Sequence, residues 1–481
     1  MWAFVLYDPR KDQLFLSRDR LGIKPLYFFS ESGVFAFASE IAPLLELADL
    51  KPIILRYRLA NAVVYGAIDA HEQTIYKDVF QLRGGHSAVL DLADHNWNCW
   101  RYWNLPRDAV RSLSDKEVLD EYSYLLEDSV KIRLRADVPL AITLSGGVDS
   151  SAVALAVSRV GRKDVPAYTS HFSEYPKIDE TEYAVEVARM CGLETRSIEP
   201  DVSRLLQDES KLCAHQELPF GSLSLYIHWT IIEKIKQQRI KVVFSGQGGD
   251  ELFLGYECYF AAKVLSSLPN IAGAFRDFIN CARKSRLGIS GMAAYQAYFT
   301  VDSVQAFYRR ARLKSGINAS ILSCASTQER KVPANLQDLQ EKELLGEQLS
   351  HLLRYDDRTV SAHGMETRLP FLDYRLVEFA YRLPWKFKIR DGWSKWLSRA
   401  YLDQHGLDSI AWRRQKLSFN APTAHWVHLL WRKNGQKLID SDRKKRLLAK
   451  KFNPDKLSDS CLWDVYNLLE LSNVMGWAEI V

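Results

Sequence analysis

The apolar and polar positions of this 481-residue chain follow two successive patterns. Residues 1–105 contain short runs of alternating or wholly apolar residues between turn-forming residues, which is typical of antiparallel hairpins. The strands predicted there cover residues 2–7, 13–17, 34–39 and 87–90. From residue 115 to residue 200 apolar runs alternate with helical patterns, which predicts βαβ units and a parallel sheet covered by helices. Residues 102–106 are predicted to be a linker, and Ser114 the N-cap of the next helix.

One stretch of the second region has the composition of an anion-binding loop. Residues 137–144 are apolar and β-branched, as a buried parallel strand should be, and residues 151–158 are predicted to be a helix. Between them stands LSGGVDSS, at residues 144–151. A strand that turns through glycines into a helix exposes backbone N–H groups at a helix N-terminus, where a phosphate is stabilised. Asp149 would repel that phosphate, so its presence implies a divalent cation, Mg²⁺, between the two.

A second glycine-rich loop follows another predicted strand. Residues 240–244 are apolar, and residues 245–251 are SGQGGDE. Because ligands of open α/β sheets bind beyond the carboxyl ends of the strands, the two loops are expected to clamp a nucleotide together. Asp250 has two interpretations, a helix N-cap or a second metal carboxylate, and its pairing with the first loop favours the metal. Neither loop is a Walker A motif or a dinucleotide fingerprint, and the first resembles the PP-loop of ATP pyrophosphatases.

The composition narrows the class of protein. A hydrophobic fraction of 47% with 13 Trp and 22 Tyr is that of a folded chain, and the length predicts about two to four domains. The net charge of +5 is spread thinly, which does not favour nucleic-acid or membrane partners. Seven scattered cysteines without zinc spacing predict reduced thiols. Since neither a long apolar run nor a signal-peptide pattern occurs, the expected location is the cytoplasm.

Longer motifs along the chain resemble the asparagine synthetase family, the glutamine-dependent class with an N-terminal glutaminase and a C-terminal PP-loop synthetase. The matching stretches are residues 4–8, 17–27, 37–40, 144–151, 245–256, 364–373 and 392–395. The resemblance implies an α/β fold, a PP-loop ATP pyrophosphatase (adenine nucleotide α-hydrolase-like) parallel sheet preceded by a partial α+β N-terminal-nucleophile amidotransferase domain. It implies an amidotransferase-like part at residues 1–105 and a synthetase at residues 115–481, with a helical insertion near residues 257–350 that has no readable chemical motif.

The resemblance also implies roles at the matching positions. The residues implied to bind the nucleotide are Leu144 and Ser170 at the adenine, Ser145, Gly146, Gly147, Asp149 and Ser150 at the pyrophosphate, and Ser245 and Gly246 at the ribose and α-phosphate. Asp149 and Asp250 would hold Mg²⁺. Lys395 would stabilise charge on the transferring phosphate, usually the largest catalytic contribution. Glu366 and Arg368 would lie near the acceptor acid or form a structural salt bridge, and both interpretations stay open.

The implied reaction consumes ATP in two steps. A carboxylate attacks the α-phosphate of MgATP, which forms an acyl-adenylate and pyrophosphate, and an amine then displaces AMP. In the parent family the acid is aspartate, activated as β-aspartyl-AMP, and the amine is ammonia, free or derived from glutamine. The chain is therefore expected to be an amide-forming ligase of asparagine biosynthesis, and the resemblance also allows a homodimer.

The first part of the chain departs from the family pattern. The family's glutaminase uses a Cys directly after the initiator Met, with the α-amine of that Cys as the base. Position 2 here is Trp, and no cysteine lies near the start. The chain as given is therefore expected not to hydrolyse glutamine, either because the start site is placed too far downstream or because the domain is a remnant. Residues 2–8 are predicted to be an inner strand that, without its neighbours, exposes a sheet edge.

The second glycine loop departs from the pattern at two positions. Gln247 stands where many members carry Glu, at a position expected to face the acyl-adenylate, and Leu254 replaces a Gly. Gln247 leaves the ATP chemistry intact and puts the acceptor in question. One alternative is therefore a related PP-loop ligase or cyclase that acts on another carboxylate, such as a peptide, a lactam precursor or a sugar acid. The other is an inactive relative that serves as a binding subunit.

Overall fold

The computed structural model describes residues 1–481 apart from residues 32, 48, 109–112, 269, 327–332, 334, 347, 415–420 and 441–445. At its centre is a five-stranded sheet with the strand order β11-β10-β9-β12-β13, in which every neighbouring pair is parallel. The strands are β9 (Leu140–Thr143), β10 (Ala167–Ser170), β11 (Thr195–Ile198), β12 (Val242–Phe244) and β13 (Glu366–Arg368). The predicted parallel sheet is therefore confirmed.

The order of these strands creates a topological switch point between β9 and β12. From β9 the chain runs outward through β10 to β11, and it then returns to place β12 on the other side of β9. The helices between these strands are α4 (Val148–Arg159), α5 (Thr181–Cys191), α6 (Val202–Gln216) and α7 (Ser224–Gln237). A ligand crevice lies outside the carboxyl ends of the strands at such a point. The two glycine-rich loops follow β9 and β12, so they border this crevice.

Helix α3 (Asp115–Arg133) begins where the sequence predicts it. Ser114 Oγ accepts a hydrogen bond from the backbone N–H of Glu117 at 3.3 Å, and the Glu117 carboxylate accepts one from the N–H of Ser114 at 2.8 Å. This reciprocal capping box satisfies two N–H groups that would otherwise lack partners. Farther along the helix, the hydroxyl of Tyr122 donates to Ser398 Oγ at 2.9 Å and so ties α3 to α17 (Trp396–Gln404).

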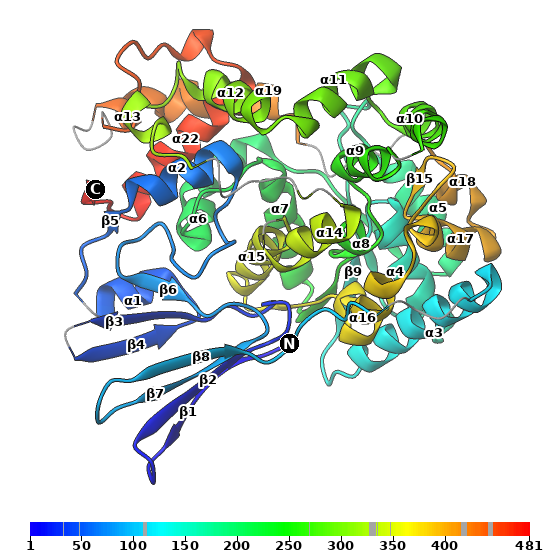
Figure 1. Cartoon of the computed structure of the whole chain (residues 1–481), viewed down its shortest axis with the longest axis horizontal. Coiled ribbons are helices and arrows are strands. Elements are labelled where there is room, and N and C mark those ends of the chain that lie inside the picture. The colour runs from blue at the N-terminus through cyan, green and yellow to red at the C-terminus, as the bar shows by residue number, and fades with distance from the viewer. Residues whose placement is uncertain are drawn as a thin grey trace.

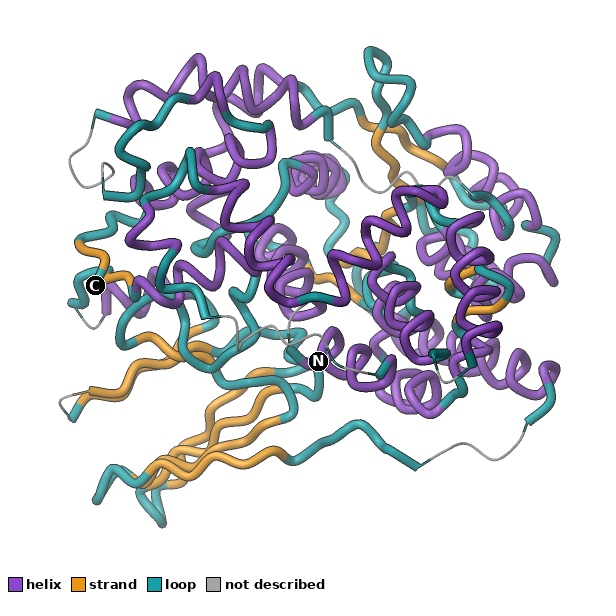
Figure 2. The backbone as a smooth tube through the Cα atoms, turned by 45° about the horizontal axis from the view of Figure 1, so that its top comes forward, coloured by secondary structure: helices purple, strands orange, loops and turns teal. Residues whose placement is uncertain are grey.

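The N-terminal residues form two antiparallel sheets that share a small core. One sheet has the order β1-β2-β7-β8 and the other the order β4-β3-β6, and both lie at one end of the molecule (Figures 1 and 2). Their strands are β1 (Ala3–Asp8), β2 (Gln13–Arg18), β3 (Tyr27–Glu31), β4 (Val34–Ala38), β6 (Val79–Gln81), β7 (His86–Asp91) and β8 (Trp97–Arg101). Within the described strands β1 pairs only with β2, so it is an edge strand, and its Leu6 is 58% exposed.

Most of the remaining chain is helical. The middle helices are α8 (Gly249–Leu252), α9 (Glu257–Ser266), α10 (Ile271–Lys284), α11 (Gly288–Thr300), α12 (Asp302–Leu313), α13 (Ala319–Leu322) and α14 (Leu336–Leu345). The later elements are α15 (Gln348–Ser361), α16 (Tyr374–Arg382), β14 (Ile389–Arg390), β15 (Trp393–Ser394), α18 (Asp408–Ala411), α19 (Thr423–Leu430), α20 (Gln436–Ile439) and α22 (Asp459–Val474). In the part of the chain that the structure describes, every helix is too short or too polar to cross a membrane.

The two ends of the chain are interleaved, which the sequence did not indicate. Strand β16 (Glu479–Ile480) pairs in parallel with β5 (Ile53–Ile54), directly before α2 (Arg56–Tyr65). The C-terminus accordingly lies beside β5 in Figure 1. The largest hydrophobic cluster joins buried residues of both parts, among them Ile54, Leu59 and Trp463. The N-terminal part therefore shares a core with the helices at the C-terminal end.

Candidate active site

The first glycine loop joins β9 to α4 in the geometry of a phosphate cradle. Gly146 has a φ of 70°, and a methyl group added there would lie 2.6 Å from Tyr183 Cβ, so only glycine fits. Ser150 Oγ accepts from the N–H of Ser145 at 3.3 Å and donates to the carbonyl of Gly147 at 3.2 Å. These bonds hold the loop at the N-terminus of α4, a helix of 12 residues. A phosphate fits there because the first N–H groups of a helix lack intrahelical partners.

The second loop contacts the first through two of its glycines. A methyl group added at Gly246 would lie 2.8 Å from the backbone nitrogen of Ser150. One added at Gly249 would lie 2.5 Å from Asp149 Cγ. The N–H of Ser245 also donates to the carbonyl of Arg368 at 3.1 Å, which continues the pairing of β12 with β13. The loops therefore meet across the switch point, as predicted, because glycine leaves no side chain between them.

The ammonium of Lys395 lies between the carboxylates of Asp149 and Asp250. Lys395 Nζ forms an ion pair with Asp149 Oδ2 and another with Asp250 Oδ1, the latter at 2.6 Å. The Lys395 side chain is only 4% exposed. Burial lowers the pKa of Lys395, but the charges of the two carboxylates outweigh burial and raise it above its usual value. Lys395 is therefore a charged, buried donor at the point where the two loops meet.

The two carboxylates fit a Mg²⁺ site that a nucleotide would complete. Mg²⁺ keeps several waters and is usually bound through one or two carboxylates together with substrate phosphates. Asp149 and Asp250 supply such a pair, since both reach the same ammonium. Among the described residues, no group of three or more His, Cys, Asp or Glu side chains is placed to hold a metal ion. The remaining ligands would have to come from the nucleotide and water.

The other residues predicted to bind the nucleotide lie beside these loops. Leu144 follows β9 and is 1% exposed, and its N–H donates to the carbonyl of Tyr168 at 2.8 Å. Ser170 ends the neighbouring strand β10, so both residues are at the carboxyl end of the sheet. Gln247 is half-buried within the second loop, and its N–H donates to Ser245 Oγ at 3.4 Å. The roles assigned to these residues stay predictions.

Glu366 and Arg368 lie at the two ends of the short strand β13, and Arg368 is at the end beside the second loop. Glu366 begins β13 and pairs with Val242, the first residue of β12, so it lies at the opposite end of the strands from the loops. Its carboxylate forms an ion pair with Arg368 Nε at 2.8 Å. Arg368 also donates to the carbonyl of Arg135 at 2.9 Å, ahead of β9. The ion pair fits the salt-bridge interpretation, and the role of Glu366 near the acceptor acid stays a prediction.

Two residues directly after the second loop have a conformation or a close contact that the motif did not reveal. Leu254, where the family pattern has Gly, has a φ of 58° in the left-handed region and is 1% exposed in a hydrophobic cluster. Left-handed backbone at a bulky residue is strained, and such strain often occurs at functional sites. Gly255 lies against both Asp250 and Lys395, because a methyl group there would overlap Asp250 Oδ1 and Lys395 Cε. The glycine at position 255 suits this close approach.

We expect the substitution Gly255→Ala to lower turnover about 10- to 100-fold, because moving a catalytic group by about 1 Å has effects of that size. The added methyl group would push apart the Asp250 carboxylate and the Lys395 side chain. Steady-state rates of pyrophosphate release would measure the effect. Gly221→Ala is a matched control, since a methyl group there meets no atom within 4 Å and the backbone of Gly221 is not left-handed. Equal losses in the two variants would show that the contact at Gly255 is unimportant.

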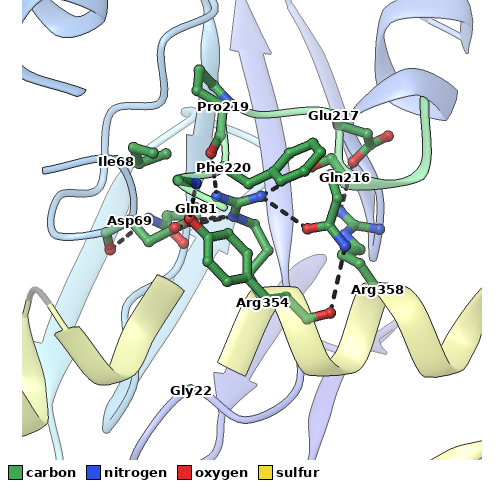
Figure 3. A network of polar contacts seen from close by, with 12 residues as sticks. Gly22, Ile68, Asp69, Gln81, Gln216, Glu217, Pro219, Phe220, Arg354 and Arg358 are labelled. Carbon is green, nitrogen blue, oxygen red and sulfur yellow. Dashed lines mark hydrogen bonds and ion pairs between the residues drawn. The ribbon is translucent and has the colours of Figure 1, made fainter. Parts of the chain in front are cut away.

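A second buried polar centre lies between the N-terminal part and α15. Arg354, on α15, donates from Nε to both carboxylate oxygens of Asp69 at 3.0 Å (Figure 3). Its Nη2 donates to the carbonyl of Pro219 at 2.9 Å. The Arg354 and Asp69 side chains are 4% and 5% exposed. Arg358, one turn later, forms an ion pair with Glu217 at 2.7 Å. A chamber of about 30 Å³ lies beside Arg354, too small for anything beyond one or two water-sized molecules.

The fold and the Asp149–Lys395–Asp250 cluster define an α/β protein of the PP-loop ATP pyrophosphatase class. The chain belongs to the asparagine synthase family, whose model matches residues 121–470. A model of the glutamine amidotransferase domain matches residues 1–103. The asparagine synthase family consists of ATP-dependent ligases, as the sequence motifs predicted.

Among three relatives of this chain, two are named asparagine synthetases and the third is named an amidase. Asparagine synthetase [glutamine-hydrolyzing] 3 of Bacillus subtilis is 26% identical over 429 residues, which are 86% of this chain and 66% of that protein. Putative asparagine synthetase [glutamine-hydrolyzing] 2 of Methanocaldococcus jannaschii is 33% identical over 261 residues, 53% of this chain and 49% of that protein. Amidase chyE of Penicillium rubens is 28% identical over 439 residues, 81% of this chain and 64% of that protein. The chain thus spans about half to two thirds of the length of these relatives.

Proposed function

We propose that this chain is an ATP-dependent ligase that adenylates the side-chain carboxylate of aspartate and transfers the acyl group to ammonia, which forms asparagine. The observation that carries the proposal is the buried ammonium of Lys395 between Asp149 and Asp250, where the two glycine loops meet. A cation held in place before the reaction stabilises the charge that develops on a transferring phosphate. Membership of the asparagine synthase family supports ATP as the nucleotide.

Each group of the site has a part in this reaction. The N–H groups of the first loop and of the N-terminus of α4 would bind the leaving pyrophosphate. Asp149 and Asp250 would hold Mg²⁺, which supplies positive charge beside that pyrophosphate. When Mg²⁺ also binds the Asp149 and Asp250 carboxylates, the Lys395 ammonium would donate to oxygens of the α-phosphate. Its raised pKa keeps it protonated at neutral pH.

The bonds change in two displacements. A carboxylate oxygen of aspartate forms a bond to the α-phosphorus as the bond from that phosphorus to the bridging oxygen breaks, and pyrophosphate leaves with the electron pair. Ammonia then attacks the acyl carbon, AMP leaves with the electrons of the carbon–oxygen bond, and the nitrogen loses a proton. The sum is aspartate, ATP and ammonia converted to asparagine, AMP and pyrophosphate.

Incubation of the purified chain with MgATP, aspartate and ammonium should release AMP, pyrophosphate and asparagine in equal amounts. The measurement is a coupled pyrophosphate assay together with chromatography of the nucleotides. Reactions without aspartate or with EDTA are the controls, and neither should release pyrophosphate or AMP. Formation of ADP in place of AMP would contradict the proposed reaction class.

A second candidate is a ligase that activates a larger carboxylic acid. Two observations favour it: the relative named Amidase chyE and the neutral Gln247. A panel of acids that includes short peptides would separate the candidates in the same pyrophosphate assay. Pyrophosphate release with a peptide but none with aspartate would favour the second.

A further inference from the structure

Gln340 is a buried polar residue in the helical region whose sequence has no readable chemical motif. It lies on α14 and is 2% exposed. Its side-chain nitrogen donates to the carbonyl oxygens of Glu251 at 3.1 Å and Leu252 at 2.7 Å, and its side-chain oxygen accepts from Lys388 Nζ at 2.7 Å. The orientation of the amide is determined by these partners, because carbonyls only accept and an ammonium only donates.

The two carbonyls that Gln340 binds belong to α8, the short helix that carries Asp250. This helix has only four residues, Gly249–Leu252. The last carbonyls of a helix lack intrahelical partners and need others when they are buried. Glu251 and Leu252 are both 0% exposed, so water does not supply those partners. Gln340 therefore supports two successive peptide groups, Glu251–Leu252 and Leu252–Phe253, close after Asp250.

Lys388 connects the same amide to the segment that carries Lys395. The hairpin of β14 and β15 separates the two lysines, and the N–H of Trp396 closes it by donating to the carbonyl of Lys388 at 3.0 Å. At its other end the N–H of Lys395 donates to the carbonyl of Phe253 at 2.9 Å. The hairpin is thus connected to α8 through Lys388 by way of Gln340, and to Phe253 directly after α8 through the N–H of Lys395.

We propose that Gln340 is a positioning residue for the Asp250–Lys395 pair, because its buried amide joins the Lys388 end of the hairpin to the carbonyls of α8. The role rests on the proposed function, in which this pair acts on MgATP. The helical region thereby contributes to the active site, because α14 keeps the Asp250 carboxylate of the second glycine loop within reach of the Lys395 ammonium. A shift of about 1 Å between such groups is enough to cost about 100-fold in rate.

The test compares Gln340→Met with Gln337→Met, an exposed residue of the same helix. In the pyrophosphate assay the first variant should lose about 10- to 100-fold in kcat and the control less than about twofold. A binding measurement separates this role from general loss of structure. Mg²⁺ should strengthen the binding of α,β-methylene-ATP to the wild type, and Gln340→Met should lose about tenfold of that gain. Binding of AMP in EDTA should stay within about twofold, which a disordered site would not allow.

Two further variants keep the proposal open to refutation. Gln340→Glu retains an acceptor for Lys388 but loses the donor to the carbonyls, so it should not restore activity. Lys388→Met/Gln340→Met also removes the buried lysine, which in the single variant loses the amide oxygen and keeps the carbonyl of Tyr381 at 3.3 Å. The double variant should therefore fold even where the single variant does not. Full activity and full Mg²⁺-dependent binding in Gln340→Met or in Gln340→Glu would overturn the proposal. An equal loss of AMP binding in EDTA and of Mg²⁺-dependent binding would overturn it too. A wild type without pyrophosphate release refutes the proposed function instead, and the binding measurement still tests Gln340.

Discussion

Replacing Lys395 with methionine should lower the rate of pyrophosphate release about 1,000-fold, the upper range for the loss of one preorganised donor. The Lys395 side chain is 4% exposed and its ammonium lies between Asp149 and Asp250, so neither water nor another side chain can take its place. Binding of MgATP should change by less than about tenfold, since the glycine loops and both carboxylates remain. The effect should therefore appear in kcat and not in KM.

Two variants serve as controls for this result. Lys450→Met removes an exposed lysine of the same charge and should behave as the wild type. Lys395→Arg should not restore activity, because the side chain is enclosed and Gly255 already lies against its Cε atom. A guanidinium is also planar and larger than an ammonium, so the two are not interchangeable in a closed site. A kcat for Lys395→Met within tenfold of the wild type would exclude the lysine from the chemical step.

Replacing Arg354 with methionine should destabilise the protein by about 3–5 kcal/mol, the usual effect of removing one partner of a buried ion pair. The substitution leaves the Asp69 carboxylate buried without its cation, and it also removes the donor to the carbonyl of Pro219 (Figure 3). The midpoint of urea denaturation, followed by tryptophan fluorescence, would measure the loss. Arg432→Met, at an exposed arginine, should leave the midpoint unchanged.

The double variant Arg354→Met/Asp69→Leu tests the cause of this loss. If the uncompensated charge is responsible, the double variant should be more stable than the sum of the two single effects by about 2 kcal/mol or more. Additive effects would show that the ion pair itself matters little. The same pair joins residue 69 of the N-terminal part to α15, which leads to β13 of the central sheet. Loss of this ion pair should therefore destabilise the N-terminal part and the part that contains the central sheet in a single unfolding transition.

The parts of the site that the sequence predicted are local ones. An apolar run followed by a glycine turn and a helix pattern identifies a strand, a loop and a helix within 20 residues, so β9, α4 and the loop between them were predictable. The cap at Ser114 was predictable for the same reason, since both partners of the capping box lie within four residues. The second loop at β12 repeats this pattern. Chemistry carried by such segments can be recognised before the fold is known.

Contacts between distant segments were not predictable in this way. The register of β13 against β12 places Glu366 opposite Val242, and its ion pair with Arg368 was one of two interpretations that the sequence left open. Gln340 belongs to no motif, and only the packing of α14 against α8 brings its amide to the carbonyls beside Asp250. Pairing of β16 with β5 likewise joins segments from opposite ends of the chain.

The sequence by itself determined two glycine loops after buried parallel strands, each with an aspartate, because those features depend on neighbours in the chain. Only the tertiary structure decided where the charges of the site meet. Lys395 is 246 residues from Asp149, and its ammonium reaches both carboxylates because the hairpin before it is tied to the loop after α8. Buried charges must find their partners through packing, and packing is set by the whole fold.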